Sequence, residues 1–169
     1  MESGHVFFKE LYQEVERIAG EHGKSEGKLR LISRLLKDAV PHYDWVGFYI
    51  INPEIPRELI LGPYAGESTE HTHIPFGRGV CGQVAELERM IVIQDVSKEE
   101  NYLSCSISVK SEIVLPIFAK GKFAGELDID SHTHAPFTDV DGEFLRSVCD
   151  LVSDMLPDIA HPLSAEAAP

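Results

Sequence analysis

The chain has 169 residues, of which 43% are hydrophobic and 25% charged, so it can form one domain with a real core and is not a collagen, a coiled coil or a wholly disordered chain. Its 28 acidic residues outnumber its 15 basic ones and give a net charge of −13, which makes nucleic acids and anionic membranes poor partners. No run approaches ~20 apolar residues, and the first residues do not resemble a signal peptide. Three cysteines are too few for a secreted disulfide framework. We therefore expect a cytoplasmic protein that binds neither membrane nor nucleic acid.

Two amphipathic helices are predicted within residues 5–40. Apolar residues recur three to four positions apart over 6–19, and the same spacing returns in a second helix that ends near Val40-Pro41. The period then changes to that of strands. Residues 43–52 are rich in aromatic and β-branched side chains, and 59–66 are predicted to be their hairpin partner.

The central part of the chain alternates short elements with loops. A short extended piece is predicted at 71–76, a short helix at 80–87 and an apolar strand at 90–96. The polar stretch 97–110 is predicted to be a long loop, a kind of segment that usually has a functional task.

The last third of the chain predicts a hairpin and a closing helix. Strands at 112–120 and 123–131 are expected to turn about Gly121-Lys122. Thr138, followed three residues later by Asp141, predicts a capping box at the start of a helix over 139–156. The tail, 157–169, is rich in proline and alanine and is expected to be flexible.

This order of elements predicts an α+β fold in a single domain, residues 1–156. Hairpin strands within 43–131 form an antiparallel sheet, and helices grouped at both ends of the chain cover one of its faces. The loops then lie on the other face, where we expect a ligand pocket.

The three cysteines lie in different settings. Cys81 follows two glycines at the opening of a helix, where the helix dipole lowers a thiol pKa; the alternative is that a tight turn needed a small residue there. Cys105 lies in the polar loop and is predicted to be reactive. Cys149 lies on the apolar side of the last helix and is predicted to be a core residue.

Acidic residues on one strand point to a cation. Asp128 and Asp130 alternate with Leu127 and Ile129, so both carboxylates should lie on one face of the sheet. They repel each other unless they face a ligand ammonium, a metal ion or an arginine, and the alternative is a solvated face. Glu112 begins the neighbouring strand and is expected near the same pocket.

Two His-x-His pairs offer a weaker signal. His71 and His73 lie in one loop-like segment, and His132 and His134 lie in another. Histidines spaced in this way can bind zinc or iron, but solvated loop histidines have the same pattern. We therefore predict no metal and keep a metal-binding protein as a minor alternative.

Six stretches in order carry a resemblance to a known family: DWVGFY, LILGPYAG, HIPFGRGVCG, QDV, SEIVLPI and LDIDS. From about Asp44 to Leu156 the chain resembles a GAF domain and, among GAF domains, the free methionine-(R)-sulfoxide reductases. The resemblance implies thiol-dependent reduction of free L-methionine (R)-sulfoxide to methionine. Cys105 matches the attacking cysteine, and Cys81 or an external thiol would resolve its oxidised form.

The same resemblance assigns further residues. Glu112, Asp128 and Asp130 match acidic residues that hold the substrate's amino group and assist proton transfer, and Trp45 and Tyr49 match aromatic residues that enclose the methyl-sulfoxide end. It implies no bound cofactor, an external thiol reductant such as thioredoxin, and a homodimer that pairs through the terminal helices.

The sequence departs from the family pattern at a third cysteine. His71 occupies the position of that residue, and the segment before Cys105 is more similar to GAF domains of sensory proteins. A non-catalytic GAF module that binds a small ligand or senses redox state is therefore the alternative function.

Overall fold

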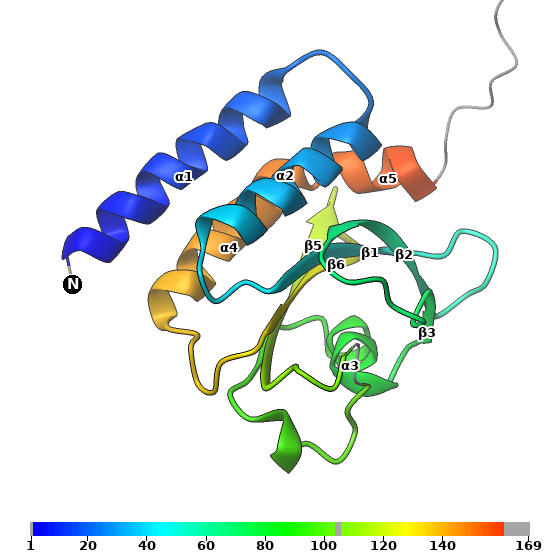
Figure 1. Cartoon of the computed structure of the whole chain (residues 1–169). Coiled ribbons are helices and arrows are strands. Elements are labelled where there is room, and N and C mark those ends of the chain that lie inside the picture. The colour runs from blue at the N-terminus through cyan, green and yellow to red at the C-terminus, as the bar shows by residue number, and fades with distance from the viewer. Residues whose placement is uncertain (1, 104–105, 161–169) are drawn as a thin grey trace, which may run out of the picture.

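The computed structural model describes residues 2–103 and 106–160. Its centre is a six-stranded antiparallel sheet in the order β3-β2-β1-β6-β5-β4 (Figure 1). The predicted hairpins, β1–β2 and β5–β6, are confirmed, and pairing between β1 and β6 joins them. The strands are β1 Trp45–Ile51, β2 Glu58–Ala65, β3 His73–Pro75, β4 Ile91–Ile93, β5 Ser111–Ala119 and β6 Lys122–Ser131.

Helices lie on both faces of the sheet, but unequally. Helices α2, α4 and α5 cover one face, with α1 packed on α2 and α4 from outside, while a short helix and the loops around it lie on the other (Figure 1). This arrangement confirms the predicted α+β architecture. The helices are α1 Glu2–Gly20, α2 Ser25–Ala39, α3 Gly79–Leu87, α4 Asp139–Val152 and α5 Met155–Ala160, with a short 3-10 turn, η1, at Val96–Lys98.

The main core lies between the sheet and the terminal helices. Leu127 and Ile129 of β6 are fully buried there against apolar side chains of α2 and α4. A smaller apolar cluster lies on the opposite face, where side chains of α3, which packs against β5 and β6, join Trp45 and Tyr49 of β1. The sheet is therefore buried on both faces, and the second cluster forms the floor of the candidate site.

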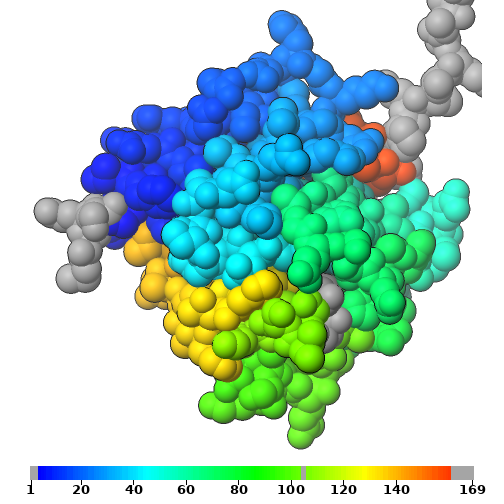
Figure 2. Space-filling view, viewed as in Figure 1, coloured from blue at the N-terminus to red at the C-terminus, as the bar shows by residue number. Residues whose placement is uncertain are grey.

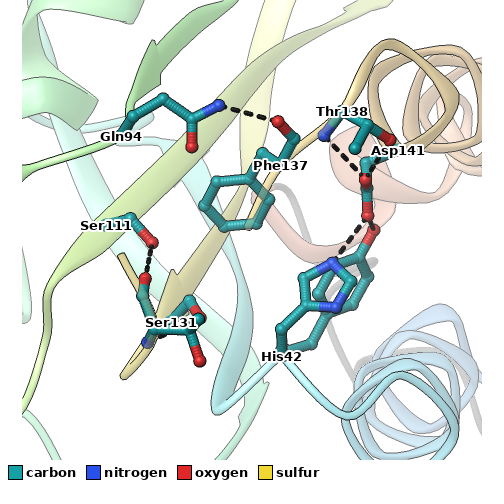
Figure 3. Close-up of polar contacts among 9 residues, drawn as sticks. His42, Gln94, Ser111, Ser131, Phe137, Thr138 and Asp141 are labelled. Atoms are coloured by element: carbon teal, nitrogen blue, oxygen red, sulfur yellow. Dashed lines mark hydrogen bonds and ion pairs between the residues drawn. The ribbon is translucent and has the colours of Figure 1, made fainter. Parts of the chain in front are cut away.

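The start of α4 is fixed by the predicted capping box. Asp141 Oδ2 accepts hydrogen bonds from the backbone N–H and the hydroxyl of Thr138, at 2.8 and 2.7 Å. Its other oxygen accepts a 2.8 Å bond from the Tyr43 hydroxyl and lies 2.8 Å from His42 Nε2 (Figure 3). The cap thus connects α4 to the segment that leads into β1.

Two boundaries near the end of the chain differ from the predictions. The β5–β6 turn is formed by Lys120 and Gly121, both with positive φ, as a two-residue hairpin turn of type I′ requires. The last helix is interrupted after Val152, and the described part of the predicted tail, 157–160, is helical. Pro157 is tolerated because it lies in the first turn of α5, where a missing N–H leaves no hydrogen bond unmade.

None of the helices among the described residues is long and apolar enough to cross a membrane.

Candidate functional site

Pairing between β1 and β6 assembles the candidate site. Trp45 is the register partner of Asp130, and Tyr49 is the partner of Glu126. Leu127 and Ile129 belong to the helix-side core, so the acidic residues between them face the other way, as the alternation predicted. The aromatic and acidic side chains predicted to bind substrate are therefore neighbours on the loop face of the sheet.

Four buried carboxylic acids, which we call the acidic cluster, gather on this face: Glu112, Glu126, Asp128 and Asp130, each at most 5% exposed. Glu112 on β5 pairs in register with Asp130 on β6. Glu126 was not among the predicted site residues. It lies two positions before Asp128, so extending the same alternation by one step would have found it.

Cys81 lies beside the acidic cluster. It is in the first turn of α3 and is 5% exposed, and its Sγ is 3.9 Å from Oε1 of Glu112. Burial raises the pKa of the Cys81 thiol, and the nearby charges of Asp128, Glu126 and Glu112 raise it further. The expected lowering of this pKa by the helix dipole is therefore wrong, because desolvation and three acidic neighbours outweigh the dipole.

Burial raises the pKa values of three acids of the cluster, Glu112, Glu126 and Asp128. Burial, followed by the charges of Asp128 and Asp130, raises the pKa of Glu112 well above its usual range. Burial likewise raises the pKa of Glu126. The pKa of Asp128 rises to about 6 through burial, although hydrogen bonds with Glu112 and Cys81 favour its charged form. Such a cluster can either hold protons or accept a cation.

An aromatic wall adjoins the acidic cluster. The ring of Trp45 stacks with that of Tyr64 at a centroid distance of 5.3 Å, and with that of Tyr49 at 6.4 Å. The indole N–H donates to the carbonyl of Glu67, and the Tyr49 hydroxyl donates to the carbonyl of His71 at 2.9 Å. Groups that suit an apolar end and a cationic end of one ligand thus lie side by side.

Two small cavities separate the predicted residues into two groups. Tyr49, Cys81, Glu112 and Asp128 line one, of about 10 Å³, together with His71 and Leu103. Trp45 and Asp130 line the second, of about 20 Å³. The predicted attacking residue, Cys105, lies outside the described residues.

A wider surface hollow adjoins the second cavity and shares Asp44, Glu67 and His132 with it. It is an open groove where α2 meets β2, visible in Figure 2 at the junction of the cyan and green surfaces. Arg30, Arg34 and Lys37 line it together with acidic side chains that include Asp44 and Glu67. Among the described residues no cysteine lines this groove, so the chemistry of its described lining differs from that of the candidate site.

The histidine pairs do not assemble a metal site in the part of the chain that the structure describes. His132 Nδ1 is 3.6 Å from a carboxylate oxygen of Asp44, and His134 Nδ1 is 3.9 Å from one of Asp95. Each thus faces a separate acid. The one group of three metal-type ligands found among the described residues is Cys81, Glu112 and Asp128.

Cys149 lies on α4 in the helix-side core, 4% exposed. This confirms its predicted packing role and leaves Cys81 as the described cysteine that faces the site.

Comparison with known proteins agrees with this geometry. The GAF domain family model matches residues 29–156. The free methionine-R-sulfoxide reductase of Saccharomyces cerevisiae is 36% identical over 124 residues, covering 73% of this chain and 68% of that protein, and the one from Escherichia coli is 32% identical over 142 residues, covering 84% of each. The structure of the free methionine-R-sulfoxide reductase from Neisseria meningitidis in complex with its substrate superposes with a TM-score of 0.85 at 30% identity, covering 94% of this chain and 93% of that one. The chain belongs to the GAF domain family, and within it to the group that includes the free methionine-R-sulfoxide reductases.

Proposed function

We propose that this protein reduces free L-methionine (R)-sulfoxide to methionine at the face shared by Cys81, the acidic cluster and the aromatic wall. The observation that carries the proposal is the position of four buried acids beside stacked aromatic rings and a thiol. A free amino acid brings an ammonium group that such acids complement. The relatives named for this activity cover most of the chain at 32–36% identity, which supports the same assignment.

The acidic cluster and the aromatic wall would bind the two ends of the substrate. Glu112, Asp128 and Asp130 would hold the ammonium group, and Trp45 and Tyr49 would enclose the methyl-sulfoxide end. A cavity of about 10 Å³ holds no more than a water molecule. The site must therefore widen when the amino acid enters.

The chemistry requires two thiols and an acid. In the first step the Cys105 thiolate attacks the sulfoxide sulfur, and protons from buried acids such as Glu112 allow the oxygen to transfer to Cys105, giving methionine and a sulfenic acid on Cys105. In the second step the Cys81 thiol, or an external one, attacks that sulfenic acid, which releases water and forms a disulfide. An external dithiol such as thioredoxin then returns both cysteines to the thiol state, which fits a cytoplasmic setting.

The first prediction tests this activity and its attacking residue. NADPH consumption through a thioredoxin system is measured with the R and S forms of free methionine sulfoxide supplied separately, and dithiothreitol serves as a second reductant. We expect turnover of the R form alone. Cys105→Ser should abolish turnover yet still bind the sulfoxide, because it removes only the nucleophile.

Cys149→Ser is the matched control, since this cysteine packs in the core away from the site. It should retain turnover with both reductants. Absence of turnover with either reductant in the wild-type protein would contradict the proposal.

A binding module without turnover is the second candidate. The raised pKa of Cys81 favours it, because a protonated thiol resolves a sulfenic acid slowly. His71, which stands where the family pattern has a third cysteine, favours it as well. This candidate predicts that methionine sulfoxide or a similar amino acid binds with no thiol consumed.

A further inference from the structure

The side chains of Cys81, Glu112 and Asp128 are arranged around one point. Each offers one ligand atom, and these three atoms all lie within 4.8 Å of one another, with 3.9 Å between Cys81 Sγ and Glu112 Oε1. In a tetrahedral zinc site, sulfur and oxygen ligands at their usual bond lengths are separated by about 3.5 Å. Small rotations of these side chains would therefore bring all three into bonding distance of a single ion.

The acids at this point have no basic side chain paired with them among the described residues. None of the ion pairs among the described residues involves Glu112, Glu126 or Asp128. Arg78 lines the same cavity, but its side chain is exposed to solvent. A buried group of acids without a cationic partner is costly, and a bound cation removes much of that cost.

Glu126 provides a second, independent observation. It is fully buried, and both of its carboxylate oxygens lack a hydrogen-bond partner among the described residues. Oδ1 of Asp128 also lacks a hydrogen-bond partner among the described residues. Because buried polar atoms are nearly always paired in folded proteins, these atoms indicate a ligand at this position. The charge of Glu126 contributes to the raised pKa of the Cys81 thiol, so its carboxylate lies near the same site.

We propose that Cys81, Glu112 and Asp128 bind one Zn²⁺ ion in the reduced, substrate-free protein, with Glu126 or a water molecule at the fourth position. A sulfur ligand combined with oxygen ligands selects zinc over magnesium and calcium, which take six or more oxygen ligands. The adjoining cavity of about 10 Å³ accommodates one small ion or water molecule.

Zinc and the substrate would exclude each other. Glu112 and Asp128 are two of the acids assigned above to the ammonium group, so this consequence rests on the proposed function, whereas zinc binding itself does not. Zinc would also occupy the Cys81 thiol and keep it from attacking the sulfenic acid on Cys105. The ion would therefore act as a competitive inhibitor of the reductase.

The test uses the reduced full-length protein after a chelator has removed bound metal. Isothermal titration with Zn²⁺ should give one ion per chain. Co²⁺ serves as a spectroscopic probe, because sulfur coordination produces an intense near-ultraviolet charge-transfer band. Cys81→Ser should abolish this band, and Asp128→Asn should weaken zinc affinity at least tenfold.

Cys149→Ser is the matched control and should bind both metals as the wild type does. Glu126→Gln, which keeps the size of the side chain, gives a second variant should Asp128→Asn fail to fold, and it should weaken zinc affinity by a smaller factor. Absence of stoichiometric zinc binding would overturn the proposal. A cobalt band that persists in Cys81→Ser, or that disappears in Cys149→Ser, would also overturn it.

A competition experiment separates this proposal from the proposed function. Free methionine, which carries the same ammonium group as the sulfoxide, should lower the apparent zinc affinity in proportion to its concentration. Stoichiometric binding that depends on Cys81 in a protein without reductase activity would support the zinc site and contradict the proposed function. Zinc binding that methionine leaves unchanged would overturn the mutual exclusion.

Discussion

The indole ring of Trp45 lies where two glycines leave room for it. A Cβ atom added at Gly47 would be 2.5 Å from Cζ3 of Trp45 and 2.8 Å from Cβ of Tyr64, and one added at Gly66 would be 2.5 Å from Cδ1 of Trp45. Real Cβ atoms do not approach other atoms this closely. The position of Trp45 in the aromatic wall therefore depends on the absence of side chains at Gly47 and Gly66.

Gly47→Ala should displace the Trp45 ring and weaken substrate binding. Losing the stacked wall removes about 1.4 kcal/mol of contact energy, so we expect KM for methionine sulfoxide to rise about tenfold while kcat changes less. Steady-state kinetics measures both constants. Ile50→Val is the control, because Ile50 packs in the helix-side core and its truncation reduces stability without touching the pocket. Equal KM values for Gly47→Ala and the wild type would contradict this role of Gly47.

Sequence patterns predicted which face of the sheet Asp128 and Asp130 occupy, but not how folding changes the pKa of the neighbouring thiol. The alternation in β6 predicted that Asp128 and Asp130 share a face, since it depends only on strand geometry. The pKa of Cys81 depends on Glu112 and Glu126, which come from two other strand positions and approach the thiol only after folding. Local sequence around Cys81 contains no information about those neighbours, so the dipole argument gave the wrong direction.

At the scale of elements, the start of α4 depends on the side chain of Asp141. Asp141 is buried; its Oδ2 accepts a hydrogen bond from Thr138, and its Oδ1 accepts one from Tyr43 and also lies beside His42 Nε2 (Figure 3). Burial alone would raise its pKa, but hydrogen bonds with His42, Thr138 and Tyr43 lower the pKa of Asp141 to about 2. Its charged form thus stabilises the helix start against the segment before β1.

The stability of the protein should therefore fall in acid because of Asp141. Its folded-state pKa of about 2 lies below the unfolded value of about 3.9, so the charged form contributes about 2 kcal/mol that is complete above about pH 5 and is lost as the pH falls toward 2. Urea unfolding at several pH values between 5 and 2 measures this loss. The difference in unfolding free energy between the wild type and Asp141→Asn should shrink by about 2 kcal/mol over this range. A difference that stays constant with pH would contradict the assignment.

Element boundaries were predicted well where local rules decide them. The capping box of Thr138 and Asp141 is an example, because caps are encoded by adjacent residues, whereas the turn between β5 and β6 lies one residue earlier than predicted. Helix α5 was missed because Pro157 was interpreted as the end of a helix. Tertiary packing decides its conformation instead, since Leu156 and Ala160 are buried in the helix-side core.

For the whole molecule, the decisive contact is the long-range pairing of β1 with β6. It joins the two hairpins and brings Trp45 opposite Asp130, 85 positions later in the chain. No local pattern specifies this register, although the order of hairpins and helices was enough to predict the architecture. Most residues of the site were therefore predicted from the sequence, whereas their relative positions follow from the pairing of strands that are distant in the chain.

The terminal helices cover most of their own apolar surface within one chain. Leu11, Val15 and Ile18 of α1 are buried, and Phe8 stacks on Phe144 of α4 at 4.6 Å. Val6 and Phe7 remain 55% and 39% exposed at the start of α1, beside a groove between α1 and α4. On α1, this end therefore offers the apolar surface for a homodimer through the terminal helices.

We expect a homodimer in which the Val6 and Phe7 side chains of one copy are covered by the other. Light scattering coupled to gel filtration at about 0.15 M salt should give a mass near twice 18.8 kDa. Because each copy carries a net charge of −13, lower salt should favour dissociation. Phe7→Ser should give a single chain, whereas Phe118→Ser should not, since Phe118 is 40% exposed on β5 and so matches Phe7 in exposure but not in place. A wild-type mass of 18.8 kDa, or equal effects of the two substitutions, would contradict this interface.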